Sequence, residues 1–477
     1  MVSTRLRELA RTHPTATALV AGDSQFSHAD LLQAGAEVRQ LLEHAGVGRG
    51  DVVMISLPFG RRAVSTFVAC ADLGSIFFPV NTAWRAAELS WLAAQVTPRV
   101  VVVKREDATR WTEAGVAADR FVFEDRLDPT SSVSKDAAAR AWPDDHPAVY
   151  LCTSGSTGHP RIVARTHGKL LRSATATAAA VSFGPGCRLL ATVPLHHGNG
   201  FSNNLLLPLL SGGTLILLER FEPAAAADMI EHHAIDTLWG SPAVYGLLVD
   251  AGVPAKSLSS LRSCFSGGAP LAPAVAEEWR RRYRIPIRQS YGSTETGLVC
   301  IQLDDMRSDG VGQPLPDTTI RILHDGRPLG SGEVGEVVVR GPSVLDGYVA
   351  PAEESAPRYW RGFYRTGDLG WLDERGQLHL VGRTQPWINI GGVKVDPNEV
   401  RLVLSQMLGV RDCLVEAERG PRGIDLISAT IAPEPGVELT RADVIRHCRQ
   451  HLAEYKIPRV LRFVPALVTD LTGKVPK

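Results

Sequence analysis

Hydroxyl side chains and glycines are concentrated in one short segment that has the chemistry to bind phosphate. The segment consists of Thr153, Ser154, Gly155, Ser156, Thr157 and Gly158, and Arg161 follows shortly after it. Backbone N–H groups and hydroxyls in such a loop can surround an oxyanion, and a guanidinium adds fixed positive charge for a polyphosphate. The spacing differs from the GxxxxGKS or GxxxxGKT of P-loop nucleotide hydrolases, which the sequence therefore does not favour. For the segment taken alone, a surface turn of the same composition remains the alternative.

A second polar cluster combines a hydroxyl with a carboxylate. Thr294 and Glu295 are neighbours within the polar segment 291–297. Mg²⁺ prefers one or two carboxylates together with phosphate oxygens and water, so this pair suits a phosphate and its magnesium ion. Upstream, the glycine-containing segment 267–270 offers backbone without side chains, which a flat heterocycle can approach closely. Ordinary turns explain both segments equally well when each is considered alone.

Six segments occur in the order in which the acyl-adenylate-forming superfamily carries its motifs. They are TSGSTGHPR at 153–161, GGAP at 267–270, YGSTETG at 291–297, YRTGD at 364–368, GRTQPWINIGGVKVDPNEV at 382–400 and LTGK at 471–474. The chain resembles this superfamily of AMP-binding enzymes, and it is closest in kind to the acyl-CoA and aryl-CoA synthetases.

The resemblance implies a nucleotide site made from all of these segments. The first loop is expected to hold the β and γ phosphates of ATP, and Thr294 and Glu295 are expected to contact the α-phosphate and the magnesium ion. The residues expected around adenine and ribose are Gly268, Ala269, Pro270, Tyr291, Gly292, Asp368 and Arg383. Lys474 matches the lysine that bridges the substrate carboxylate and the α-phosphate. The residues expected to act in catalysis are Thr294, Glu295, His197 and Lys474, with Glu295 as the metal ligand.

The implied reaction has two steps in one active site. The carboxylate of the acid attacks the α-phosphorus of ATP, and pyrophosphate leaves, which gives an acyl-AMP. The C-terminal domain then rotates about a hinge at Gln385, and its loop containing Gly391 and Gly392 shapes a tunnel for coenzyme A. The thiol of coenzyme A finally displaces AMP. The resemblance therefore implies an ATP- and Mg²⁺-dependent acid–thiol ligase.

Two departures from the family pattern leave alternatives open. Arg161 replaces the usual lysine, and an arginine keeps the charge without the geometry of a lysine. Gln385 stands directly before Pro386, and a residue before proline is restricted to extended backbone. One alternative is a ligase specialised for one half-reaction, either thioester formation from a supplied acyl-adenylate or adenylation for a separate carrier protein. Another, from a different class, is a non-catalytic acyl-nucleotide binding protein, against which the set of catalytic residues argues.

The histidine-containing segment 194–201 matches the family element that opens the acyl pocket, and His197 aligns with its gating histidine. Gly198 stands where enzymes for 2-hydroxybenzoate place asparagine, and no aspartate follows to bind the ammonium group of an amino acid. We therefore expect a bulky, mainly apolar acid with one polar group to be recognised. The expected wall residues are His197, Gly198, Asn199, Phe201, Asn203, Trp239, Ser241 and Gly292, although core packing explains Trp239 equally well.

Apolar and helical segments alternate through most of the chain, which is typical of parallel α/β sheets. The apolar run 52–56, the helical spacing 61–73 and the apolar run 77–80 form a first βαβ unit. After about residue 310, short segments broken by Gly and Asp predict a small β lobe. We expect an α/β multi-lobed N-terminal domain, with parallel-sheet lobes plus this β lobe, over residues 1–384. A small, mobile α+β C-terminal domain is expected over 385–477.

Composition limits the expected partners. Lys and Arg total 51 and so do Asp and Glu, so no whole-chain field attracts nucleic acid or an acidic membrane. The seven cysteines are scattered without a CxxC pair, which is typical of a reducing compartment. We expect a cytoplasmic enzyme without nucleic-acid or membrane partners. Its expected partners are a small carboxylic acid, ATP and coenzyme A, with a carrier protein as the alternative acceptor.

Overall fold

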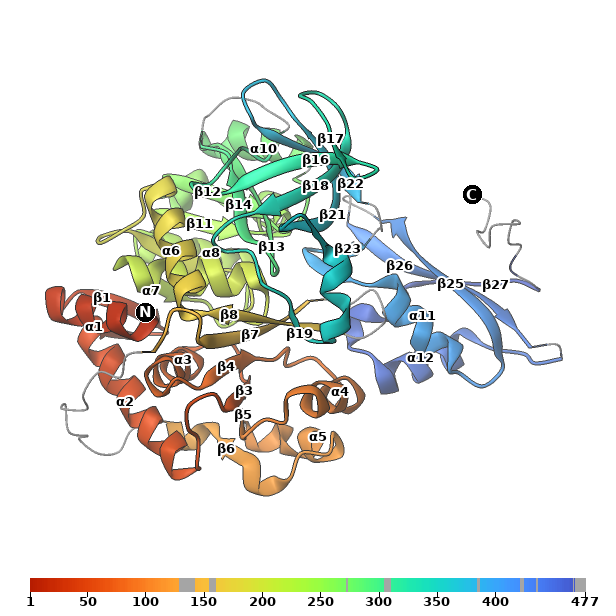
Figure 1. Ribbon diagram of the computed structural model, residues 1–477, viewed down its shortest axis with the longest axis horizontal. Coiled ribbons are helices and arrows are strands. Elements are labelled where there is room, and N and C mark those ends of the chain that lie inside the picture. Colours follow the sequence, from red (N-terminus) through yellow and green to blue (C-terminus); the bar gives the residue numbers. More distant parts are fainter. Residues whose placement is uncertain are drawn as a thin grey trace.

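Two large β-sheets form the body of the protein (Figure 1). The computed structural model describes residues 1–127, 142–153, 160–271, 273–303, 310–383, 387–420, 424–434, 436–465 and 467. One large sheet has seven strands and the other has nine. A six-stranded sheet lies toward the top of Figure 1, and the C-terminal part of the chain lies at the right.

The seven-stranded sheet is built from βαβ units. Its order is β19-β8-β7-β4-β3-β5-β6. Strands β7, β4, β3, β5 and β6 are parallel to one another, and β8 is antiparallel to both of its neighbours, β7 and β19. The strands are β3 (Val52–Ser56), β4 (Ile76–Pro79), β5 (Val100–Val103), β6 (Phe121–Phe123), β7 (Pro147–Thr153), β8 (Arg161–Thr166) and β19 (Tyr348–Ala350). Helices α3 (Arg61–Leu73), α4 (Ala86–Val96) and α5 (Ala108–Glu113) connect or cover them. Strand β5 consists of four buried valines, which suit a parallel strand covered on both faces.

The nine-stranded sheet has the order β15-β14-β13-β12-β11-β9-β10-β1-β2, and it is parallel from β13 to β1. The strands are β1 (Thr17–Ala21), β2 (Ser24–Ser27), β9 (Arg188–Ala191), β10 (Thr214–Leu217), β11 (Thr237–Gly240), β12 (Ser263–Gly267), β13 (Ile287–Ser293), β14 (Gly297–Ile301) and β15 (Gln313–Pro314). The helical segments around it include α1 (Val2–Thr12), α2 (His28–His44), α6 (His167–Val181), the π-helix η4 (Gly200–Leu206), α7 (Leu207–Ser211), α8 (Pro223–His232), α9 (Pro242–Asp250) and α10 (Pro273–Tyr283). One hydrophobic cluster joins the two large sheets, because Phe77 of β4 and Leu189 of β9 belong to the same core.

The remaining elements are a β lobe and a C-terminal α+β unit. The β lobe contains β16 (Thr319–His324), β17 (Arg327–Pro328), β18 (Gly335–Arg340), β20 (Tyr359–Trp360), β21 (Phe363–Leu372) and β22 (Leu378–Arg383). The C-terminal unit contains the hairpin β23 (Ile388–Ile390) and β24 (Val393–Val395), α11 (Pro397–Ser405), β25 (Val410–Arg419), β26 (Asp425–Pro433), α12 (Arg441–His451), η9 (Glu454–Lys456) and β27 (Val460–Phe463). These elements confirm the predicted fold class. The predicted domain boundary falls in residues 384–386, which lie outside the described residues.

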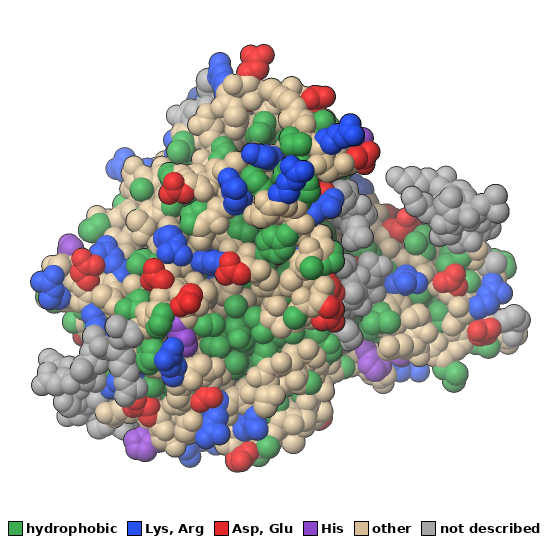
Figure 2. All heavy atoms as spheres, viewed as in Figure 1, with side chains coloured by type: hydrophobic (Ala, Val, Ile, Leu, Met, Phe, Trp, Pro, Cys, Tyr) green, Lys and Arg blue, Asp and Glu red, His purple; other side chains and the backbone are tan. Residues whose placement is uncertain are grey.

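Charged side chains of both signs are mixed over the face shown in Figure 2, in keeping with the equal totals of 51 basic and 51 acidic residues. Among the described residues, no helix combines the length and the apolar character that crossing a membrane requires.

Candidate active site

The predicted site residues meet where parallel strands of both large sheets end. Strands β4 and β7 of one sheet, and β9, β11, β12 and β13 of the other, each lead at their carboxyl end into a segment that lines one cavity of about 380 Å³. Ligands of α/β sheets bind at this edge, since the connecting loops there are free to vary. The predicted residues that line the cavity are Thr153, His197, Gly198, Asn199, Asn203, Ser241, Gly268, Gly292, Thr294, Glu295, Gly391 and Gly392.

Thr294 and Glu295 lie in the turn between β13 and β14. The Ser293 N–H donates to Thr296 Oγ1 at 3.0 Å, the Thr296 N–H donates back to Ser293 Oγ at 3.2 Å, and these two bonds fix the turn. Gly198 comes so close from the opposite loop that an added Cβ would lie 2.8 Å from Thr294 Oγ1. Only glycine allows this approach, which keeps the Thr294 hydroxyl at the cavity surface.

The carboxylate of Glu295 has phenols and guanidinium groups around it. Tyr348 Oη donates to Glu295 Oε1 at 3.5 Å and lies 2.8 Å from Tyr364 Oη. The buried guanidinium of Arg165 has its pKa lowered to about 10 by burial, and the charge of Glu295 opposes this shift. One carboxylate beside a threonine hydroxyl on a cavity wall fits a magnesium ion that takes its other ligands from phosphate oxygens and water. Within the described residues, no group of three or more His, Cys, Asp and Glu is arranged to hold a metal ion by itself.

Arg161 does not line the cavity as the phosphate-loop prediction required. Its side chain is 3% exposed, and its Nε donates to Glu354 Oε2. The guanidinium also lies over the ring of Tyr348, 5.3 Å from the centroid. In this structure Arg161 therefore anchors the strand after the loop against the segment that holds Glu354. Ser154, Gly155, Ser156, Thr157 and Gly158 lie outside the described residues.

Asp368 and Tyr291 are hydrogen-bonded to each other. Tyr291 Oη donates to Asp368 Oδ2 at 2.6 Å. Asp368 of β21 is the cross-strand partner of Arg383 of β22, so the two predicted ribose residues are neighbours in the β lobe. Gly268 follows β12 with φ +86° and open space around it, while Ala269 and Pro270 continue the loop. The expected adenine and ribose residues thus lie on adjoining loops and strands, although Asp368, Tyr291, Ala269 and Pro270 do not line the main cavity.

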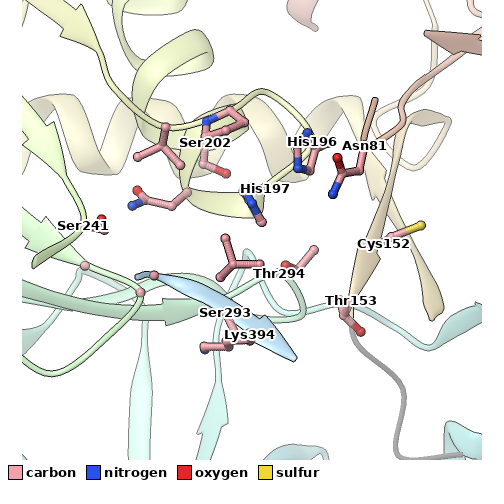
Figure 3. A pocket seen from close by; sticks show the side chains of 18 of the residues that line it. Asn81, Cys152, Thr153, His196, His197, Ser202, Ser241, Ser293, Thr294 and Lys394 are labelled. Atoms are coloured by element: carbon pink, nitrogen blue, oxygen red, sulfur yellow. The ribbon is translucent and has the colours of Figure 1, made fainter. Parts of the chain in front are cut away.

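His197 lies opposite Thr294 across the cavity (Figure 3). Its ring centroid is 4.4 Å from that of His196. Burial lowers the pKa of His197 to about 4, and the positive charge of Lys394 acts in the same direction. The imidazole is therefore neutral at pH 7, and it offers one N–H donor and one acceptor without a charge.

Two predicted wall residues are core residues instead. Phe201 is fully buried, and its ring packs against Phe67 and Phe77 with centroid distances of 5.6 and 6.3 Å. Trp239 is also fully buried and packs against Phe265 at 4.6 Å. Neither side chain reaches the cavity. An aromatic residue next to a pocket-forming loop has the same sequence spacing whether it faces the pocket or the core, so the spacing alone did not separate the two.

The C-terminal unit supplies the remaining wall of the cavity. The turn between β23 and β24 contains Gly391 and Gly392, with φ +62° and +100°. Asn389 Oδ1 accepts from the Gly392 N–H at 2.7 Å and holds the turn. A Cβ added to Gly392 would lie 2.9 Å from the Cβ of Ser241. The backbone of Gly392 in the C-terminal unit therefore packs directly against the side chain of Ser241 in the body of the protein.

A buried ion-pair cluster, which sequence reasoning missed, joins the same two parts. Lys456 Nζ donates to Glu88 Oε1 of α4 and to Glu399 Oε1 of α11, each at 2.6 Å. The side chains of Lys456, Glu88 and Glu399 are 6%, 8% and 11% exposed. Burial alone would lower the pKa of Lys456, but Glu399, Tyr455 and Glu88 outweigh it, so the pKa is raised and the lysine stays charged. The sequence signal was a lysine within the apolar segment that follows α12.

The neighbouring Tyr455 adds two hydrogen bonds across the same interface. Tyr455 Oη accepts from Asn81 Nδ2 at 3.1 Å and from Trp84 Nε1 at 3.3 Å. Asn81, Trp84, Tyr455 and Lys456 all line the cavity. The interface is therefore part of the site and not remote from it. Lys474 and Gln385 lie outside the described residues, and only the backbone of Arg383 is described.

Comparison with known proteins relates the whole chain to one enzyme family. Residues 6–349 match the family described as AMP-binding enzyme, and residues 399–474 match the AMP-binding enzyme C-terminal domain. A feruloyl-CoA synthase of Amycolatopsis sp is 31% identical over 481 residues, which cover 98% of this chain and 96% of the relative. A Mycobacterium tuberculosis enzyme named 3-[(3aS,4S,7aS)-7a-methyl-1,5-dioxo-octahydro-1H-inden-4-yl]propanoyl:CoA ligase is 32% identical over 505 residues, which cover 100% and 97% of the two chains.

The fold is likewise that of a solved structure. The o-succinylbenzoate CoA synthetase of Bacillus subtilis, in a structure with its bound product analogue, matches with a TM-score of 0.91 at 24% identity. The match covers 99% of this chain and 97% of that protein, so it includes both the body and the C-terminal unit.

Proposed function

Because the chain belongs to the AMP-binding enzyme family and is an acid–thiol ligase, we propose that it is an ATP- and Mg²⁺-dependent carboxylic acid:CoA ligase. It acts through an acyl-AMP intermediate, and its acid is bulky and mainly apolar. The observation that carries the proposal is the convergence of Thr294, Glu295 and His197 with the Gly391–Gly392 turn on one cavity. The residues that act on the nucleotide and the turn that admits the thiol then border the same cavity.

In the first step, a carboxylate oxygen of the acid attacks the α-phosphorus of ATP, and the bond to pyrophosphate breaks. The Thr294 hydroxyl donates a hydrogen bond to the α-phosphate, and the neutral ring of His197 faces the reacting carboxylate across the cavity. Asp368 and Arg383 hold the ribose, whose hydroxyls donate hydrogen bonds to the carboxylate of Asp368. Lys474 neutralises charge between carboxylate and phosphate. A bound Mg²⁺, held by Glu295 and phosphate oxygens, supplies further neutralisation of the negative charge.

In the second step, the sulfur of coenzyme A attacks the acyl carbonyl, and the bond between this carbon and the AMP oxygen breaks. Thioester and AMP are the products, and the thiol gives up its proton. The turn at Gly391 and Gly392 carries no side chains at the cavity wall, which leaves room for a pantetheine arm. The described orientation of the C-terminal unit, with this turn against the cavity, suits the second step better than the first.

Wall composition supports a bulky acid. Val244 and Leu247 of α9 and Leu298 of β14 supply apolar surface, while Gly268, with nothing within 4 Å of an added Cβ, leaves space. The two relatives described above are named for feruloyl and octahydro-indenyl propanoyl groups, both of which contain rings. We place the enzyme in the cytoplasm, since all seven of its cysteines are unpaired thiols, as is usual in reducing compartments.

The test measures the two half-reactions separately. Pyrophosphate release is followed with ATP and a panel of ring-bearing acids, and thioester formation is followed with a supplied acyl-adenylate. Lys474→Ala is expected to slow adenylation by about 10²-fold or more while thioester formation from the adenylate is retained. Equal loss in both reactions, or no activity of the unaltered protein with any acid, would contradict the proposed function.

The same assay addresses the alternatives that Gln385-Pro386 and Arg161 leave open. A protein that performs only one half-reaction is a specialised ligase, and comparison of coenzyme A with a phosphopantetheinylated carrier protein identifies the acceptor. Binding of an acyl-AMP mimic without activity in either half-reaction would favour a non-catalytic acyl-nucleotide binding protein.

A further inference from the structure

Two asparagines in the acid-binding part of the cavity pair with each other. Asn199 and Asn203 flank the first turn of η4, and Asn203 Nδ2 donates to Asn199 Oδ1 at 2.7 Å. Both side chains line the cavity, and Asn203 is only 7% exposed. Among the described residues, neither amide has a further hydrogen-bond partner. π-Helical turns are frequent at functional sites.

The next residue on the same turn shows what a structural asparagine looks like here. Asn204 is fully buried, and its Oδ1 accepts from the N–H groups of Thr192 and Val193 at 2.9 and 3.0 Å. Its Nδ2 donates to the Trp239 carbonyl at 3.0 Å. Asn204 thus satisfies its amide within the protein and fixes the loop after β9. The Asn199–Asn203 pair keeps part of its hydrogen-bonding capacity directed into the cavity.

The unused capacity is one donor group and one acceptor. An amide pair joined by a single N–H···O bond leaves the NH₂ group of one side chain and the carbonyl oxygen of the other without any hydrogen bond, whichever way the two amides are oriented. Nearby, an added Cβ at Gly267 would lie 3.9 Å from Asn199 Nδ2, so this amide faces the end of β12. The cavity is also lined by Ser202, Ser241 and Ser290, which carry hydroxyl groups.

We propose that the Asn199–Asn203 pair selects acids that carry a hydroxyl group on their apolar frame. This inference rests on the proposed ligase function. A hydroxyl both donates and accepts hydrogen bonds, so it pairs with the unused NH₂ group and with the unused carbonyl oxygen. A ketone or a second carboxylate only accepts and would leave the unused asparagine carbonyl without a donor, and a methyl group would leave both the unused NH₂ group and the unused carbonyl without a partner. Leaving a buried polar group without a partner is unfavourable, and this cost makes the pair selective.

The experiment compares matched acids on the unaltered enzyme. The probes are 3-phenylpropanoic acid with a hydroxyl or a methyl group at ring position 2, 3 or 4, together with the matching acetyl compounds as acceptor-only analogues. Pyrophosphate release gives kcat/KM for each acid. At the best position the hydroxyl acid is expected to exceed both the methyl and the acetyl acid by about 10- to 100-fold.

Asn203→Leu and Asn199→Leu then test whether the pair is responsible. Each is expected to reduce the ratio of kcat/KM for the hydroxyl acid to kcat/KM for the methyl acid to less than about threefold, since leucine has the same branched shape and no hydrogen-bonding group. Circular dichroism and thermal unfolding show whether each variant is folded, and Asn199→Ala serves in place of either variant that fails this check.

Three results would overturn the inference. They are equal rates for hydroxyl and methyl acids at every ring position, a higher rate for an acetyl acid, and a hydroxyl preference that persists in the leucine variants. Failure of every acid to release pyrophosphate would remove the ligase function itself. Activation of acids without a hydroxyl preference would remove only this selectivity.

Discussion

Gly392 packs against Ser241 where the C-terminal unit meets the body of the protein at the cavity. A Cβ on Gly392 would meet the Ser241 Cβ at 2.9 Å and its Oγ at 3.0 Å, so neither side can yield through a flexible side-chain end. The glycine is therefore required here by the neighbouring chain as well as by its φ of +100°.

Gly392→Ala is expected to slow thioester formation from a supplied acyl-adenylate by about 10- to 100-fold, because displacement of a wall by about 1 Å disturbs the thiol path. Pyrophosphate release should change much less. Gly376→Ala is the matched control, since Gly376 also has a positive φ, +77°, but nothing within 4 Å. Similar losses in the two variants would show that backbone strain, and not the contact with Ser241, is the cause.

His167 predicts a loss of stability in acid. It is fully buried, neither ring nitrogen has a hydrogen-bond partner among the described residues, and burial lowers the pKa to about 4. Below about pH 6.5 the unfolded chain binds a proton that the folded chain does not, so the free energy of unfolding falls as the pH drops from about 6.5 to 4. The loss is on the order of 1–3 kcal/mol.

His167→Phe should flatten this part of the pH profile, which denaturant titrations at several pH values measure. The exposed His44→Gln is the control. An unchanged slope in the phenylalanine variant would mean that other groups cause the acid sensitivity.

Among single residues, the polar residues of the motifs could be predicted from the sequence, whereas the packing partners of their side chains could not. Thr294, Glu295 and Gly198 line the cavity because each stands in a loop that follows the carboxyl end of a parallel strand. Arg161 lies outside the cavity lining and donates to Glu354, which stands 193 residues away, and no local sequence pattern predicts this pair.

At the scale of elements, β21 and β22 present both predicted ribose residues. Because Asp368 and Arg383 face each other across the two strands, their alignment depends on the register of this hairpin. Tyr291 of β13 holds Asp368 from the nine-stranded sheet, which links the β lobe to the body.

Asp368→Ala is expected to weaken ATP binding by about 10- to 100-fold, as two hydrogen bonds to a charged acceptor are lost. Tyr291→Phe keeps the carboxylate and should have a smaller effect. Calorimetric titration with ATP measures both. A larger loss in the phenylalanine variant would mean that Asp368 acts mainly to hold Tyr291.

Elements built from neighbouring segments were predicted closely. The expected strand at 52–56 and helix at 61–73 coincide with β3 and α3, since each has its own clear periodicity. Strand β19 was not predicted, because the three residues Tyr348–Ala350 derive their strand structure from pairing with β8, far away in the sequence. The hairpin turn at Gly391 was found from its motif, but its position against Ser241 was not.

At the scale of the whole molecule, the cluster of Lys456, Glu88 and Glu399 holds the C-terminal unit against α4. Lys456→Met is expected to destabilise this orientation by about 3–5 kcal/mol, because two buried carboxylates lose their counterion. Thioester formation should therefore slow at least about tenfold, while adenylation is less affected.

The control for this variant is Lys256→Met, which removes an 88% exposed lysine whose nitrogen lies 3.7 Å from Glu231. Adding Glu88→Gln and Glu399→Gln to Lys456→Met should restore part of the rate, since the uncompensated charges are then gone. Equal effects of the two single lysine variants would contradict a role for the buried cluster.

The contacts of Tyr455 and Lys456 with Asn81 and Glu88 span 374 and 368 residues of chain. During synthesis, the strands and helices of the first sheet leave the ribosome long before these partners exist. The early lobe must therefore fold with Glu88 and Asn81 still facing water, and the cavity acquires its last wall only after Tyr455 and Lys456 have been synthesised. Until then, a nascent chain has parts of the acid and nucleotide sites but no enclosed space in which to join their ligands.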